Sequence, residues 1–141
     1  MKDANRMLRE NYSNDVLALF TELAPKAFDF LRLEHGMVGP LEKELGISFQ
    51  GPDYSIEIGL DPREGLWVGL SADVDERHLS SSLQCLYVES GLGPAQSIKN
   101  TARTTHSLHK AIDTNAQALR RLLPNLKPGN RDLLFIKCHG R

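Results

Sequence analysis

The chain has 141 residues, of which 40% are hydrophobic and 25% are charged, with 11 glycines and 7 prolines. This length and composition exclude a disordered or collagen-like chain and predict a single globular domain over residues 1–141. The sequence contains no apolar run of about 18 residues that would span a membrane. Its first residues, MKDANRMLREN, lack the apolar segment of a secretory signal. We therefore expect a cytoplasmic protein without membrane contact.

The formal net charge of −1 conceals an uneven distribution of charge. Residues 1–95 contain 16 acidic and 8 basic residues, whereas residues 96–141 contain 2 acidic and 9 basic residues. The densest acidic stretch is residues 53–76, in which seven acidic residues accompany one base, Arg63. Such asymmetry affects the choice of partner and the rate of association rather than the fold.

The N-terminal part is predicted to be helical. The sequence Ser13-Asn14-Asp15 supplies helix-capping side chains, and apolar residues recur at intervals of three and four from Val16 to Leu23. Pro25 interrupts this pattern, which continues over residues 27–33, so we expect a kink or a second short helix there. Residues 40–46 are predicted to form a connector with at most one helical turn.

From Ile47 onwards the apolar pattern changes to a period of two. Apolar residues alternate with polar or small residues over 54–60 and again over 66–72. The sequence between them, Asp-Pro-Arg-Glu-Gly at 61–65, favours a turn. These features predict an antiparallel hairpin, extended by a strand at 47–50, whose polar side, with Glu57 and Trp67, faces water or a partner. A sheet this small needs helices on one face to be stable.

Helical periodicity returns after this hairpin. One helix is predicted behind the capping residue Asp75, with apolar residues over 79–88. A longer helix is expected beyond Pro94, with an apolar stripe that ends near Pro124. This stripe is compatible with packing on the sheet and with a homodimer. Residues 132–137 fit either an edge strand or a short helix.

The predicted fold class is thus α+β, with a small antiparallel sheet of two to four strands packed against N-terminal and C-terminal helices. Cys85 and Cys138 lie far apart and form no C-x-x-C motif, so we interpret them as two buried thiols in a reducing cytosol. No linker, repeat or low-complexity tract divides the chain.

No sequence motif predicts catalysis or a cofactor. His106 and His109 share one helix face, and Cys138 with His139 are the other candidate metal ligands, but zinc sites usually contain two recognisable ligand pairs. The Gly91–Pro94 segment lacks the spacing of a phosphate-binding loop. We therefore expect no metal, no cofactor and no enzymatic activity. The alternative is an enzyme whose site is assembled only in three dimensions, with a deep pocket lined by perturbed acids or histidines.

Two segments give the chain a family resemblance. The first is the helical segment FDFLRLEHGM at 28–37, and the second is the hairpin with YSIEI at 54–58 and LWVGL at 66–70, followed by closing helices. In this layout, residues 16–123 resemble the small α+β immunity proteins of bacterial contact-dependent inhibition and related polymorphic toxin systems. The resemblance implies an inhibitor of a cognate toxin and transfers no functional residue.

The charge distribution is compatible with such an inhibitor. Many bacterial toxins are nucleases with basic clefts, onto which an acidic surface would be steered rapidly. Two aromatic residues are candidate anchors of the contact. The predicted partner-binding residues are Tyr54, Glu57, Asp61, Glu64, Trp67, Asp73, Asp75 and Glu76. The alternative interpretation of these acids is an ordinary solvated hairpin edge.

A second functional hypothesis rests on the basic C-terminal third. Its charges could bind the phosphates of a nucleic acid, as in a small regulatory protein. Phe135 is the only aromatic residue there that could stack on a base. The basic residues are Lys99, Arg103, Lys110, Arg120, Arg121, Lys127, Arg131, Lys137 and Arg141.

Overall fold

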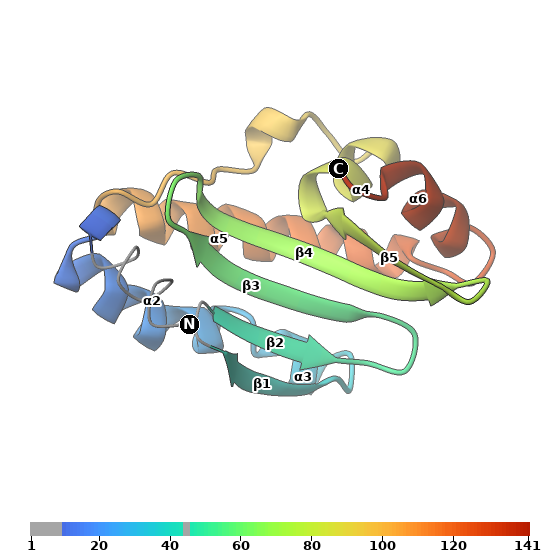
Figure 1. Ribbon diagram of the computed structural model, residues 1–141, viewed down its shortest axis with the longest axis horizontal. Helices are drawn as coiled ribbons and strands as arrows, with labels where there is room; N and C mark the ends of the chain where they lie inside the picture. The colour runs from blue at the N-terminus through green and yellow to red at the C-terminus, as the bar shows by residue number, and fades with distance from the viewer. Residues whose placement is uncertain (1–9, 44–45) are drawn as a thin grey trace.

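The computed structural model describes residues 10–43 and 46–141 and has an α+β fold (Figure 1). Five antiparallel strands form one sheet in the order β1-β2-β3-β4-β5. The predicted class is therefore confirmed, with one strand more than the upper limit of the prediction. The strands are β1 (Val38–Lys43), β2 (Gly46–Gln50), β3 (Ser55–Asp61), β4 (Gly65–Val74) and β5 (Arg77–Ser82). The helices are α2 (Asn14–Ala27), α3 (Phe30–Leu33), α4 (Leu83–Glu89), α5 (Thr105–Leu122) and α6 (Arg131–Cys138), with the 3-10 turns η1 (Ala95–Ser97) and η2 (Leu123–Asn125).

The predicted hairpin is the centre of the sheet. Its register pairs Ser55 with Ser71 at one end and Asp61 with Gly65 at the other. Ile56 and Ile58 are fully buried, because every second residue of β3 points toward the helices. The strand predicted at 47–50 pairs with β3 as β2.

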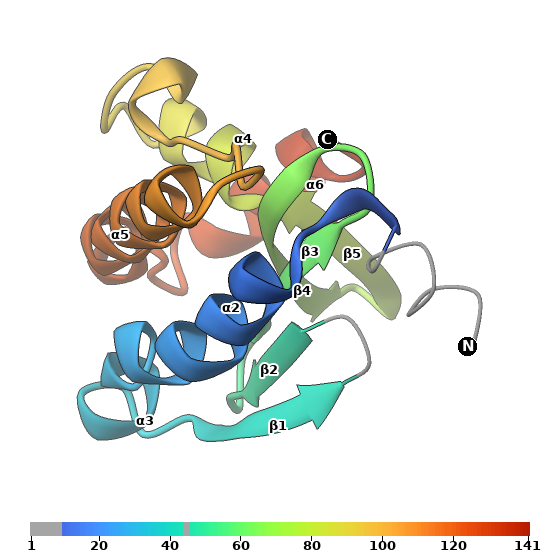
Figure 2. The same cartoon turned by 90° about the vertical axis from the view of Figure 1, so that its left-hand side faces the viewer.

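The helices cover one face of this sheet (Figure 2). Helix α2 begins where the sequence predicts, because the Ser13 hydroxyl accepts a hydrogen bond from the Val16 amide at 3.2 Å. The helix continues through Pro25, and α3 is the second short helix expected after it. Helix α5 lies beside α2 and turns its apolar stripe, including Leu108 and Leu119, into the core. No helix in the described ranges is both long enough and apolar enough to cross a bilayer.

Residues 40–46 are not the connector that was predicted. Residues 38–43 form the edge strand β1, paired with β2 with a shift in register between Val38 and Leu41. A Cβ atom on Gly39 would lie 2.7 Å from the Ser48 carbonyl oxygen, so this strand approaches β2 too closely for a side chain there. Gly39 and Pro40 conceal the strand in the sequence because both residues usually indicate a loop. Residues 44–45 of the predicted segment lie outside the described residues.

The prediction of a helix after Asp75 is wrong for the first half of that segment. Residues 77–82 form β5, and α4 begins only after Ser82, whose hydroxyl accepts the Cys85 amide at 3.1 Å. Asp75 does not cap a helix. It forms the β4–β5 turn together with Glu76, with φ angles of +50° and +66°. Two left-handed residues match the twist of a two-residue hairpin.

The long helix starts later than the position predicted beyond Pro94. Its N-cap is Thr104, which exchanges hydrogen bonds with Ser107 in a capping box. Residues 98–104 form a loop, and side chains of α5 form hydrogen bonds with the backbone N–H and C=O groups of Lys99 in this loop. The Lys99 amide donates to the Thr114 hydroxyl at 2.9 Å, and its carbonyl accepts from the Asn115 amide at 2.8 Å. The helix ends before Pro124, as predicted.

Residues 131–138 form helix α6, which resolves the choice between strand and helix.

The interpretation of Cys85 and Cys138 as two thiols is wrong, because they form a disulfide between α4 and α6. Their Cα atoms lie 5.8 Å apart, although 53 positions separate the residues in sequence. Sequence spacing did not reveal the bond because the two helices become neighbours only in the folded chain.

Candidate protein-binding surface

The face of the sheet opposite the helices carries no described helix (Figure 2). We call it the open face. Side chains alternate between the two faces of a strand. The residues of the open face are therefore the strand residues that alternate with the buried core residues and lie opposite one another on neighbouring strands. Most are small and polar, as expected for the solvated face of an antiparallel sheet. They include Gln50, Ser55, Glu57, Trp67, Ser71, Asp73, His78 and Ser80.

Trp67 is a large apolar side chain of the open face and lies near the β3–β4 end of β4. It pairs with Gly59 on β3, and its ring leans toward Gly69, where an added Cβ would lie 3.3 Å from Cζ3 of the indole. The side chain remains 36% exposed. Glu57 pairs with Gly69 and so lies beside the indole, and its carboxylate is 3.3 Å from Nζ of Lys43. The absence of a side chain on Gly69 lets the indole lie against its backbone, and Gly59 across the strand pair is buried.

The predicted acidic residues fall into two groups at opposite ends of β4. Asp61 and Glu64 belong to the β3–β4 turn, whereas Asp73, Asp75 and Glu76 belong to the β4–β5 end. A strand of ten residues separates the groups by roughly 30 Å. Trp67 and Glu57 lie between them, so the predicted residues line one face and its two ends instead of forming one cluster.

Asp61 stabilises the β3–β4 turn. Its carboxylate accepts hydrogen bonds from the amides of Arg63 at 2.8 Å and Glu64 at 2.9 Å, and its carbonyl accepts one from the Tyr12 hydroxyl. Burial raises the pKa of Tyr12, and the negative charge of Asp61 raises it further. The Leu66 amide also donates to the Asn100 carbonyl at 2.8 Å. Of the two predicted acids in this turn, Glu64 is therefore the one whose carboxylate is free of turn hydrogen bonds.

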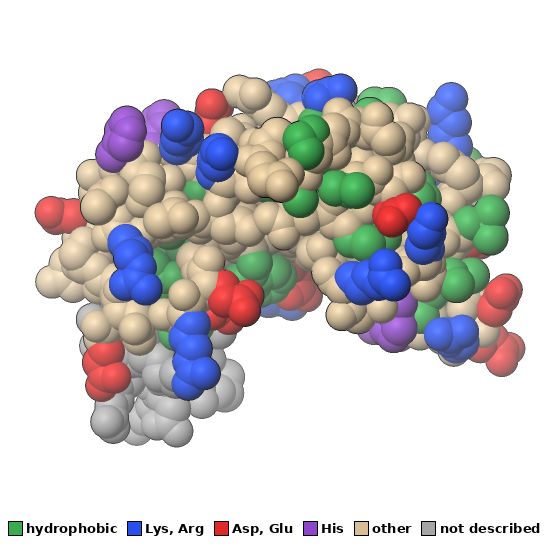
Figure 3. Space-filling model, turned by 90° about the horizontal axis from the view of Figure 1, so that it is seen from above, with side chains coloured by type: hydrophobic (Ala, Val, Ile, Leu, Met, Phe, Trp, Pro, Cys, Tyr) green, Lys and Arg blue, Asp and Glu red, His purple; other side chains and the backbone are tan. Residues whose placement is uncertain are grey.

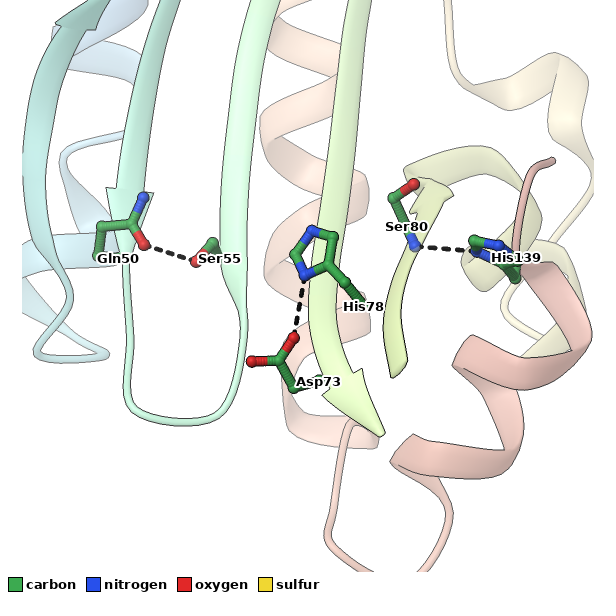
Figure 4. A network of polar contacts seen from close by, with 6 residues as sticks. All are labelled: Gln50, Ser55, Asp73, His78, Ser80 and His139. Atoms are coloured by element: carbon green, nitrogen blue, oxygen red, sulfur yellow. Dashed lines mark hydrogen bonds and ion pairs between the residues drawn. The ribbon is translucent and has the colours of Figure 1, made fainter. Parts of the chain in front are cut away.

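The β4–β5 end presents exposed charges to solvent. Asp73 Oδ1 lies 3.0 Å from His78 Nδ1, with both side chains more than two-thirds exposed (Figure 4). Asp75 and Glu76 are exposed in the turn itself. Tyr54, predicted as an aromatic anchor, is half-buried and packs against the core. Burial raises its pKa, with a smaller opposing effect from Arg131.

Several basic residues of the C-terminal third are engaged within the molecule. Three of them pair with the acidic part of the chain: Arg120 with Glu34 at 2.8 Å, Lys137 with Glu89 at 2.8 Å, and Arg131 with Asp53 at 3.6 Å. Arg120 also lies over the Phe30 ring at 4.1 Å, and Arg121 donates to the Tyr87 hydroxyl. Figure 3 shows positive and negative side chains interspersed over much of one face.

The histidines considered as metal ligands lie in separate places. His106 and His109 are exposed near the start of α5. Cys138 is bonded to Cys85, and Nδ1 of His139 accepts a hydrogen bond from the Ser80 amide (Figure 4). Within residues 10–43 and 46–141, no three His, Cys, Asp or Glu side chains are grouped so that they could hold a metal ion.

A small cavity lies beside the β3–β4 turn. Its volume is about 120 Å³, and Tyr12, Glu64 and Arg103 are among its lining residues. Small-molecule sites usually occupy about 300–1,000 Å³. The lining carries no histidine, and this cavity therefore does not have the form expected of the dispersed active site.

Comparison of the chain with protein-family models, with characterised proteins and with solved structures finds no match in any of the three. The sequence correctly placed Glu57 and Trp67 on the polar side of the hairpin, but it missed the glycine surroundings of the indole. The signal was present, because Gly59 and Gly69 interrupt two strands at outward positions.

Proposed function

We propose that this protein is a non-enzymatic inhibitor that binds a basic protein partner through the open face. The observation that carries the proposal is the partly exposed Trp67 on a face without a described helix, with Glu57 beside it and acidic residues at both ends of β4. Tryptophan is among the residues that dominate the energy of protein interfaces.

The charges of the open face favour a positively charged partner. Glu64 at one end, and Asp75 and Glu76 at the other, are exposed and would attract a basic surface over a distance of about 8 Å at physiological salt. Trp67 then supplies the apolar contact that charges alone do not provide. The short polar side chains around it can form hydrogen bonds at the rim of an interface.

Within this class, we propose an immunity protein that neutralises a cognate bacterial toxin, such as a nuclease with a basic cleft. The support is the order of elements and segments that resembles immunity proteins, together with the acidic ends of the open face. We further propose that it acts in the cytoplasm, where such a toxin would act. Inhibition requires occupation of the toxin's cleft and no chemistry by this chain.

The nucleic-acid hypothesis has less support from the geometry. Two of its basic residues, Arg120 and Arg121, contact Phe30 and Tyr87 within the molecule. Charge reversal at these positions would disturb packing as well as any contact with phosphate. Lys110 and Lys127 are exposed and test this hypothesis more cleanly.

The proposal is tested by affinity capture with the tagged protein from cells that produce it, at low and moderate salt. The test variant carries Trp67→Ala and Glu57→Lys. Asp61 is left intact, because its carboxylate stabilises a turn. The control variant makes matched changes on the helical layer, Leu33→Ala and Glu22→Lys, at side chains that are about as exposed or more so.

The expected result is one stoichiometric basic protein that is retained by the wild type and the control and lost by the test variant. Capture should weaken as salt rises. Capture of nucleic acid, or an equal yield from the test variant, would exclude the open face as the binding surface.

A further inference from the structure

The C-terminal tail closes the edge of the sheet at β5. Among the strands that the structure describes, β5 is the last in the sheet and pairs only with β4, so its other edge would expose unpaired backbone groups. The Ser80 carbonyl accepts a hydrogen bond from the Gly140 amide at 2.9 Å, and the Ser80 amide donates to Nδ1 of His139 at 3.1 Å. Figure 4 shows His139 beside this edge. The chain therefore satisfies its own edge at Ser80.

Helix α6 brings the tail to this position, and it is too short to be stable alone. Isolated helices shorter than about 12 residues are marginal in water, and α6 has eight residues. Phe135 is fully buried, but Leu133 and Ile136 are 69% and 46% exposed. Part of the apolar surface of the helix thus contributes nothing to holding it against the sheet.

The disulfide is the covalent attachment of this helix. Cys138 directly precedes His139, so the bond to Cys85 fixes the chain one residue before its contact with β5. Another link to α4 is the ion pair between Lys137 and Glu89, which is weak because Lys137 is 62% exposed. Cys138 is buried and Cys85 is partly exposed, so a reductant reaches the bond from the Cys85 side.

We propose that the Cys85–Cys138 disulfide is a redox latch on the β5 edge. In the oxidised protein it holds α6 and the tail against Ser80. A dithiol reductant attacks the Cys85 sulfur, passes through a mixed disulfide and leaves as a cyclic disulfide. Two electrons and two protons are transferred, and both cysteines become thiols. The helix then detaches and uncovers the backbone groups of this edge.

This inference goes beyond the proposed function, because it concerns an edge of the sheet instead of the open face. It also gives the two cysteines a role in a reducing cytosol, where disulfides are rare and usually transient or redox-sensing. The two experiments are independent. Failure of the capture experiment would leave the latch intact, and failure of the hydrogen-exchange experiment would leave the proposed inhibitor intact.

The test is amide hydrogen exchange on the full chain, followed at Ser80 and along α6, before and after treatment with dithiothreitol. A double variant, Cys85→Ser with Cys138→Ser, mimics the reduced state without reductant. Lys137→Ala is the matched control, since it removes the ion pair and leaves the disulfide. The amides of Ile58 and Val68 at the centre of the sheet report whether the fold persists.

The expected result is exchange at Ser80 and in α6 that is at least about tenfold faster in the reduced protein and in the double serine variant. The central amides and the Lys137→Ala control should remain close to the oxidised wild type. Unchanged exchange at Ser80 would show that the tail stays bound without the disulfide. Equal acceleration at Ile58 and Val68 would show that the bond stabilises the whole fold. Either result overturns the latch.

Discussion

Asn115 is expected to make a large contribution to stability for a single polar side chain. It is only 2% exposed, and its amide nitrogen donates to the carbonyls of Lys99 and Ala111, both at 2.8 Å. Asn115→Ala removes the donor to Lys99, whose carbonyl is then left without a partner next to the buried face of α5. Such a loss costs about 1–3 kcal/mol, and we expect a decrease of about 2 kcal/mol in the free energy of unfolding.

Thr114→Val provides the comparison, because Thr114 also forms a hydrogen bond with the Lys99 backbone. It removes the acceptor of the Lys99 amide, but water can replace this bond because the loop side is exposed, so we expect less than about 1 kcal/mol. Because both side chains act on Lys99, the double variant should lose less than the sum of the two. Urea denaturation gives all three values from the midpoints. A decrease below about 0.5 kcal/mol for Asn115→Ala would refute the reasoning.

Two further substitutions and one titration test other parts of the structure. Glu76→Gly should stabilise the protein by about 0.5–1 kcal/mol in thermal unfolding, since φ is +66° at this position; a lower stability would contradict the left-handed turn. Gly65→Ala should destabilise it by more than about 2 kcal/mol, because φ is +96° and the added Cβ would lie 2.1 Å from the Asn100 carbonyl oxygen; unchanged urea unfolding would contradict this contact. Tyr12 and Tyr54 should ionise above the ordinary pKa of about 10 in an absorbance titration. Because the pKa of each is raised in the folded state, their contribution to stability is complete below pH 10 and is lost as the pH rises through the folded pKa values. A free energy of unfolding that increases over this pH range would contradict the raised pKa.

The parts of the fold that the sequence predicted correctly depend on local signals. The cap at Ser13 and the alternation of Ile56 and Ile58 with polar residues each specify an element within a few positions. Strand β1 was missed because Gly39 and Pro40 carry loop signals, although an edge strand tolerates both. Strand β5 was mistaken for a helix because Leu79 and Leu83 are four residues apart, which matches a helical turn.

The candidate site was predicted in part for the same reason. The outward positions of Glu57 and Trp67 follow from the period of the hairpin, which is a local property. The packing of Tyr54 and the use of the Asp61 carboxylate in a turn depend on contacts with neighbouring segments. The disulfide between Cys85 and Cys138 depends on two helices that meet only after the sheet has formed.

Trp67 is the only tryptophan of the chain, so it reports directly on the open face. The most direct test is the ¹⁹F NMR signal of the protein labelled with 5-fluorotryptophan, recorded before and after addition of the captured basic partner. Binding through the open face predicts a shifted resonance that loses its sensitivity to a soluble paramagnetic quencher. A partner that binds in full while this resonance and its quenching stay unchanged would contradict the proposal.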